Sequence, residues 1–190
     1  MLTLRQLGEA KLCEVYRERM RRDFPESELK PLEMMLRMLR AGVYDALGVF
    51  DGDELAAYAL VYRRAGGRVP LLDYLAVEPS RRGHGAGSAT LELLKAHYHA
   101  SADALFIECE QPDAAPDPAG AQARIRFYRH SGARLTDLSV TLFGVDFRIL
   151  YLPLREGLGT FDCEGELLAL YKDMLAPSVF KRCVQLGRVQ

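Results

Sequence analysis

The chain has 190 residues, of which 49% are hydrophobic and 27% charged, so disordered and collagen-like classes are excluded and one globular domain over 1–190 is expected. Its net charge is −1 and its pI about 6.4, whereas nucleic-acid-binding proteins are usually strongly basic. The four cysteines form no C-x-x-C pair, and neither a signal peptide nor a long apolar run is present. We therefore expect a cytoplasmic protein with no nucleic-acid or membrane partner.

Hydrophobic periodicity predicts strands and helices that do not alternate as βαβ units. A short strand leads into two helices, and three consecutive strands follow, the first two joined at Asp51-Gly52. The stretches expected as strands are 2–7, 44–50, 55–62, 71–77, 104–110, 134–139 and 144–152. Those expected as helices are 9–22, 28–40, about 88–100, 121–130 and 164–174. The order predicts the α+β class.

Two further stretches bear on function. Gln111–Gly120, rich in Pro, Asp and Ala, is expected as a loop that is either a lid or disordered. His97 and His99 form an H-x-H pair, but no Cys or carboxylate cluster accompanies them. We expect a polar helix end there and no metal site.

The most informative stretch is Leu71–Lys95, which reads LLDYLAVEPSRRGHGAGSATLELLK. An apolar strand is followed by a turn, a loop with three glycines and a helix start. Glycines let backbone N–H groups approach a ligand closely, and a helix N-terminus adds about half a positive charge. This arrangement predicts a binding site for a phosphate or diphosphate.

Three phosphate-binding motifs can be compared with this loop. A Walker A loop needs a Lys after its last glycine, and none follows Gly87. A dinucleotide fingerprint needs a third glycine, where this chain has Ser88, and needs to follow its strand directly. The pattern [Q/R]-x-x-G-x-[G/A] is filled by Arg82, Gly85 and Gly87. A glycine-rich turn without a ligand is the remaining alternative.

That pattern resembles the acyl-CoA pyrophosphate loop of the GNAT superfamily of N-acetyltransferases. LAVEP before the loop is similar to the family's fourth strand, and RIRFYRHSGARL (Arg124–Leu135) is similar to its second signature. The resemblance covers a core of about 2–152 and leaves 153–190 as a C-terminal helical extension. It implies a GNAT fold, with a mixed and mostly antiparallel central sheet of about seven strands flanked by helices, plus an extra C-terminal helix.

The resemblance also implies how acetyl-CoA is held. The pantetheine arm would pair with backbone groups on the fourth strand, which splays from the fifth, and the diphosphate with the loop. The residues assigned to this co-substrate are Leu75, Val77, Arg82, Gly83, His84, Gly85, Ala86, Gly87 and Ser88. Tyr128 matches the tyrosine that commonly acts as general acid toward the CoA sulfur, and a phenol is protonated at neutral pH. The alternative for Tyr128 is a core aromatic beside Phe127.

Three carboxylates are candidates for the general base, in the order Glu108, Asp73, Glu110. Glu108 lies where some family members carry a catalytic glutamate, and Asp73 interrupts an apolar strand, where a carboxylate is costly unless paired or solvated. One alternative is that Asp73 and Glu108 form structural pairs with Arg126 or Arg129, and another is that a water chain replaces the base. One feature departs from the family: Ala121 stands where an asparagine is common, and the chain contains no Asn.

Taken together, these features predict a transferase, an acetyl-CoA-dependent N-acetyltransferase (acyltransferase). The acetyl group would move to a primary amine by direct attack in a ternary complex, because no cysteine has a base placed beside it in the sequence. A small-molecule or peptide amine is the expected acceptor, and a monomer or homodimer the expected assembly. The alternative is a catalytically inactive GNAT-fold module that binds CoA or a partner.

Overall fold

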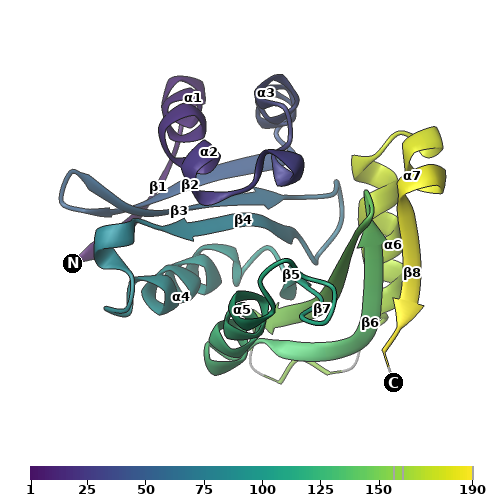
Figure 1. The fold of residues 1–190 in the computed structure, drawn as a ribbon. Helices are drawn as coiled ribbons and strands as arrows, with labels where there is room; N and C mark the ends of the chain where they lie inside the picture. Colours follow the sequence, from purple (N-terminus) through teal and green to yellow (C-terminus); the bar gives the residue numbers. More distant parts are fainter. Residues whose placement is uncertain (156, 160, 190) are drawn as a thin grey trace. The chain divides into compact units, whose positions relative to one another are not determined.

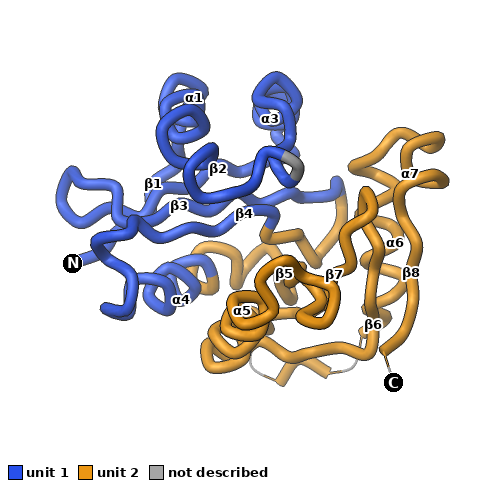
Figure 2. Tube along the Cα trace, viewed as in Figure 1, with its two compact units in different colours: residues 1–65, 73–94 blue, residues 66–72, 95–190 orange. Residues whose placement is uncertain are grey.

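The computed structural model describes residues 1–155, 157–159 and 161–189, apart from the side chain of Ser27. It divides into two compact units, which Figure 2 colours separately. The N-terminal unit comprises 1–65 and 73–94, and the C-terminal unit comprises 66–72 and 95–190. Each unit is described by itself.

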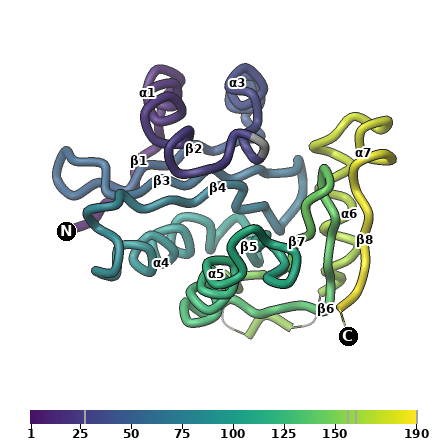
Figure 3. Tube along the Cα trace, in the orientation of Figure 1, coloured from purple at the N-terminus to yellow at the C-terminus, as the bar shows by residue number. Residues whose placement is uncertain are grey.

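The N-terminal unit is a sheet with helices on both of its faces (Figure 1). Its strands are β1 (Leu2–Gln6), β2 (Tyr44–Asp51), β3 (Glu54–Tyr62) and most of β4 (Leu71–Val77). Its helices are α1 (Glu9–Val15), α2 (Arg21–Asp23), α3 (Leu32–Arg40) and α4 (Ala86–Tyr98), the last of which it holds as far as Leu94. The chain can be followed in Figure 3, where α1 and α3 lie on one face of the sheet and α4 on the other. Both faces are thus covered, which is why β2 is buried from Tyr44 to Phe50.

Two helices of this unit differ from the sequence prediction. The first is not continuous over 9–22, because a π-helical turn at Tyr16–Met20 separates α1 from α2. The second begins at Leu32 rather than at residue 28, after a 3₁₀ turn at Glu26–Glu28. Pro31 explains the late start, since a proline disfavours helical conformation in the residue before it. The stretch between α2 and α3 therefore remains outside the α-helices.

The C-terminal unit carries the remaining strands and helices. Its strands are β5 (Ala104–Glu110), β6 (Arg134–Leu142), β7 (Val145–Pro153) and β8 (Val184–Arg188). Its helices are α5 (Pro118–His130), α6 (Cys163–Met174) and α7 (Pro177–Cys183). Strand β5 pairs with β7, β7 with β6, and β6 with β8, each pair antiparallel.

Strand β5 also pairs in parallel with the start of β4. This ladder contains only Leu71 opposite Phe106 and Leu72 opposite Ile107, all in the C-terminal unit. From Asp73 onward, the residues of β4 are not part of this ladder with β5. The complete strand order is β1-β2-β3-β4-β5-β7-β6-β8, which confirms the mixed, mostly antiparallel α+β sheet and adds an eighth strand to the seven expected.

Two features of this unit were not foreseen. The tail was expected to add only a helix, yet it also forms α7 and β8. Helix α5 begins at Pro118 instead of residue 121, because Pro at the first turn and the Asp117 carboxylate, which accepts from Gly120 N–H at 3.0 Å, favour a start there. The loop expected over 111–120 is correspondingly shorter. No helix in the described part of the chain is long and apolar enough to cross a membrane.

Candidate functional site

The glycine loop lies between the end of β4 and the start of α4. After a 3₁₀ turn at Pro79–Arg81, Gly83 and Gly85 adopt left-handed conformations with φ of 77° and 80°. Ala89 N–H donates to Gly85 C=O at 3.0 Å, so the N–H groups just before it lie at the helix terminus and have no place in the i→i−4 ladder. A Cβ built on Gly83 or Gly85 would meet nothing within 4 Å. The loop is therefore an open cradle of backbone donors at a helix N-terminus.

Arg82 fastens this loop to the strand that precedes it. Its Nε donates to Val77 C=O at 2.9 Å, and its Nη2 donates to Asp23 Oδ1 at 3.1 Å. The Asp23 side chain is only 3% exposed and also accepts from the Tyr58 hydroxyl at 2.9 Å. Nothing in the sequence linked Asp23 to the loop, because 59 residues separate it from Arg82. A contact between the Arg82 side chain and a phosphate stays a prediction.

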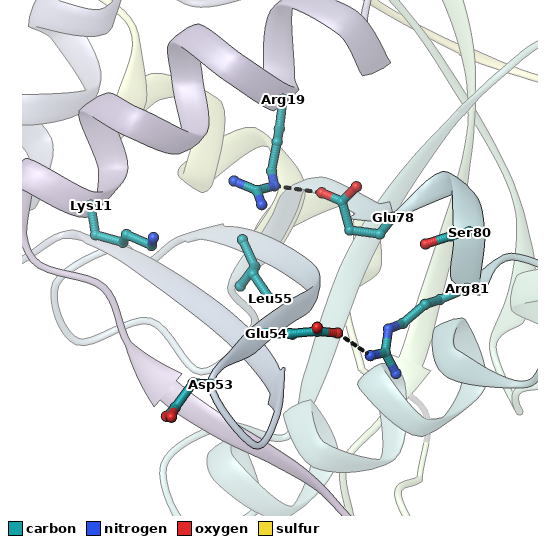
Figure 4. Close-up of a pocket in the computed structure, with 8 residues that line it drawn as sticks. All are labelled: Lys11, Arg19, Asp53, Glu54, Leu55, Glu78, Ser80 and Arg81. Atoms are coloured by element: carbon teal, nitrogen blue, oxygen red, sulfur yellow. Dashed lines mark hydrogen bonds and ion pairs between the residues drawn. The ribbon is translucent and has the colours of Figure 1, made fainter.

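A pocket of about 310 Å³ lies beside the loop in the N-terminal unit (Figure 4). Its charged residues largely pair with one another: Arg19 with Glu78, and Arg81 with Glu54 at 2.8 Å. Arg81 also contacts Asp51, which accepts from the ammonium of Met1. The Arg19–Glu78 pair is part-buried, with side chains 21% and 18% exposed, whereas Glu54 is 80% exposed. Arg81 thus contacts carboxylates of the β2–β3 hairpin, whereas its neighbour Arg82 fastens the loop.

Asp73 on β4 is held in a buried polar cluster. Its carboxylate, 4% exposed, accepts from Lys30 Nζ at 2.6 Å and from the Tyr44 hydroxyl at 2.5 Å. Burial, and next the Asp73 charge, raise the pKa of Tyr44. The Lys30 ammonium also lies 5.5 Å from the ring centre of Tyr74. Both carboxylate oxygens of Asp73 are thereby engaged, which explains structurally how this strand tolerates a charge.

Glu108 lies in β5, in the C-terminal unit, and faces helix α6. The Tyr171 hydroxyl of α6 donates to Glu108 Oε1. The next residue, Cys109, points to the opposite face, where Arg124 and Tyr128 of α5 lie within electrostatic range. Burial raises the pKa of Cys109 to about 12, so this thiol is not ionised at neutral pH. The sequence did not predict the contact between Tyr171 and Glu108, because an aromatic residue on a half-apolar helix does not indicate which residue it contacts.

Tyr128 lies on the side of α5 that packs toward β5. Ile125 and Ala121, about one and two turns earlier, are buried there, and the ring centre of Phe127 is 5.0 Å from that of Tyr128. Burial raises the pKa of the Tyr128 hydroxyl, which therefore stays protonated well above neutral pH. Within the described residues, this hydroxyl has no hydrogen-bond partner. Ala121 is fully buried, so the position where an asparagine was expected is part of the core.

Glu110, the third carboxylate candidate, forms an ion pair with Arg124. Arg126 and Arg129 were considered as partners for Asp73 and Glu108; Asp73 instead pairs with Lys30, and Glu110 pairs with Arg124 of α5. The structure thus gathers Asp73, Leu75, Val77 and the loop in the N-terminal unit, and Glu108, Glu110 and Tyr128 in the C-terminal unit. Among the described residues, no group of three or more His, Cys, Asp or Glu could hold a metal ion.

Comparison with known structures gives several folds of the same kind. The ribosomal-protein-S18-alanine N-acetyltransferase of Escherichia coli is 20% identical, with a TM-score of 0.60 over 84% of this chain and 100% of that one. A protein of Bacteroides thetaiotaomicron assigned to the GNAT family is 21% identical, with a TM-score of 0.67 over 88% and 92%. The spermidine N-acetyltransferase of Vibrio cholerae is 13% identical, with a TM-score of 0.63 over 83% and 96%. At these identities, the likeness concerns the fold.

A search of curated proteins finds no protein that matches this sequence. A family model described as the acetyltransferase (GNAT) family, however, matches residues 10–132. This range is more than half of the chain and includes the glycine loop, Glu108 and Tyr128, while α6 lies beyond it. The chain therefore belongs to the GNAT family of acetyltransferases.

Proposed function

We propose that this protein transfers the acetyl group of acetyl-CoA to a primary amine by direct attack in a ternary complex. The observation that carries the proposal is the open cradle at Arg82–Ser88, with two left-handed glycines at the N-terminus of α4. Its donors suit a diphosphate, because backbone N–H groups and a helix terminus both favour an anion. Acetyl-CoA is also the acetyl donor used generally in this family.

The residues assigned to the co-substrate fit this use. Gly83, His84, Gly85 and Ser88 are exposed, so their backbone groups are accessible. Arg82 would hold the loop in its binding conformation through Val77, and Gly87 and Ala86 belong to the first turn of α4. For the pantetheine arm, support comes from β4, whose ladder with β5 ends before Leu75 and Val77. Peptide groups without a ladder partner can pair with the amides of a ligand.

For the general base we propose Glu108 ahead of the other carboxylates, because it lies on β5 where some family members carry a catalytic glutamate. Asp73 already binds the Lys30 ammonium, and Glu110 binds the Arg124 guanidinium. Glu108 accepts a hydrogen bond from the Tyr171 phenol, and such a bond favours the ionised form of a carboxylate. In this proposal Glu108 takes the proton of the attacking ammonium, directly or through water. Asp73 and then Glu110 are the next candidates.

For the general acid we propose Tyr128. Its raised pKa keeps the hydroxyl protonated at the pH of the reaction, so the proton is present when the thiolate leaves. The absence of a hydrogen-bond partner within the described residues leaves this hydroxyl available to a substrate atom. Cys109 is not a competing nucleophile, because its thiol is buried and un-ionised at neutral pH.

The acceptor is proposed as a small-molecule or peptide amine. Two of the similar structures are named for such acceptors, an alanine of ribosomal protein S18 and spermidine. We further propose a cytoplasmic protein, monomeric or homodimeric, whose chain works as one domain with a core of about 2–152 and an extension of about 153–190. No nucleic acid or metal takes part in this scheme.

The proposal is tested by a thiol-release assay with acetyl-CoA. The acceptors offered are polyamines, amino acids, aminoglycosides and peptides with free N-termini. The double variant Y128F/E108Q should lose turnover of the best acceptor while still binding CoA by calorimetry. The matched control is Y151F/E164Q, which makes the same chemical changes at β7 and at a surface glutamate that pairs with Arg188. Unchanged turnover in Y128F/E108Q would refute the assigned roles. Tight CoA binding with no acceptor above background would instead support the inactive CoA-binding module.

A further inference from the structure

Helix α6, beyond the segment that matches the family, delivers a tyrosine to the proposed base. Tyr171 is fully buried, as are Leu167 and Leu170 on the same helix. Its hydroxyl nevertheless donates to Glu108 Oε1 on β5, 63 residues away in the sequence. Both residues belong to the C-terminal unit, so the contact lies within one compact body.

The chemistry of this pair is not what packing alone requires. A phenylalanine would fill nearly the same volume in the core without having to bury a hydroxyl, which costs free energy unless the group is hydrogen-bonded. A hydroxyl that donates to a carboxylate stabilises its ionised form and restricts its rotation. This hydrogen bond therefore favours the charged form of Glu108 and restricts its orientation.

We infer that Tyr171 is a positioning residue, which keeps Glu108 ionised and aligned to accept the proton of the amine. The inference rests on the proposed role of Glu108 as general base. It also gives the C-terminal extension a function: this part of the chain completes the acceptor side of the reaction. Residues 10–132, which match the family, contain Glu108 but not the group that orients it.

The test is the variant Y171F in the full chain, with Y151F as the matched control. Without the phenol donor the pKa of Glu108 should rise, so the acid limb of the kcat/KM profile should move up by about one pH unit. At neutral pH kcat should fall several-fold while the KM for acetyl-CoA stays unchanged. Y151F should keep the wild-type profile. A Y171F enzyme that folds normally and has an unshifted profile would overturn the inference.

A second measurement does not depend on turnover. The carboxylate of Glu108, assigned by comparison with E108Q, can be titrated by ¹³C NMR in wild type and Y171F, and its pKa should be higher in the variant. If Y171F does not fold, 3-fluorotyrosine placed at position 171 keeps the volume and makes the phenol a stronger donor. The pKa of Glu108 should then fall, and an unchanged value would contradict the inference.

Failure of the inference can be told apart from failure of the proposed function. If E108Q retains full activity, the proposed base is wrong, and the NMR titration still decides whether Tyr171 controls the carboxylate. If E108Q is inactive while Y171F matches wild type in both profile and titration, only the inference fails.

Discussion

Phe143 has a backbone conformation that its side chain does not favour. At the tip of the β6–β7 hairpin it has φ of 51°, and the following Gly144 has φ of 84°. Two-residue hairpin turns with positive φ at both positions favour Asn, Asp and Gly, because a larger side chain is strained there. The Phe143 side chain is 59% exposed, so little burial compensates for the strain.

Replacing this residue should therefore stabilise the protein. We expect F143N to raise the free energy of unfolding by about 1 kcal/mol, because asparagine adopts the left-handed conformation more readily. Urea denaturation measures the change. The control is L135N, which alters an exposed apolar residue (38%) of β6 where φ is not positive, and it should give no gain. Equal behaviour of the two variants would contradict a backbone origin.

Two neighbouring arginines should differ in their effect on donor binding. R82A removes the bonds to Val77 C=O and Asp23 that hold the glycine loop, so the KM for acetyl-CoA should rise about fivefold, the equivalent of roughly 1 kcal/mol. R81A removes only ion pairs to Asp51 and Glu54 and should stay near wild type. Steady-state kinetics at varied acetyl-CoA concentration give the KM of each variant. A larger rise in KM for R81A than for R82A would mean that Arg81, and not Arg82, holds the loop.

At the scale of elements, the sequence was most informative where periodicity is local. Strands β4 and β5 have the predicted bounds, because their apolar runs are bordered by turn residues. Strand β8 was missed, since VQLGR is five residues long, half-exposed, and becomes a strand only through its partner β6. The glycine cradle was equally predictable from local spacing. The contacts of Glu108 with Tyr171 and of Arg82 with Asp23 were not, because they join distant parts of the chain.

Removal of β8 tests what this late strand contributes. Deleting 184–190 breaks the ladder from Leu138 opposite Arg188 to Leu142 opposite Val184 and leaves α6 in place. We expect a loss of about 2–4 kcal/mol in the free energy of unfolding, from several backbone hydrogen bonds at about 1 kcal/mol each. R188A, which removes only the exposed ion pairs to Asp137 and Glu164, should cost less than about 1 kcal/mol. If both changes cost the same, the ladder adds nothing measurable.

For the molecule as a whole, buried tyrosines make the free energy of unfolding depend on pH in the alkaline range. Burial raises the pKa of Tyr44, Tyr58, Tyr74 and Tyr128 above the ordinary value near 10. In the unfolded chain these phenols ionise near pH 10, whereas in the folded protein they remain protonated. Their stabilising contribution is therefore complete below pH 10 and is lost as the pH rises through the folded values.

Unfolding by urea at pH 8 and at pH 11 should show this loss. The free energy of unfolding should fall by about 1.4 kcal/mol per pH unit for each phenol that ionises only on unfolding. The variant Y58F should have a shallower dependence than wild type, because one such phenol is gone. With nine tyrosines and no tryptophan, absorbance near 295 nm gives an independent titration. A pH-independent stability over this range would contradict the raised pKa values.

The short ladder between β4 and β5 has a consequence for amide hydrogen exchange. Leu71 and Leu72 are paired with β5, whereas Asp73–Val77 are not in its register. In a parallel ladder the N–H groups of alternate residues face the same neighbour, so those of 73–77 that face away from β3 lack a strand acceptor. Deuterium should enter these amides much faster than it enters the Leu72 amide. Added CoA should slow them selectively, giving a map of the donor site that needs no acceptor.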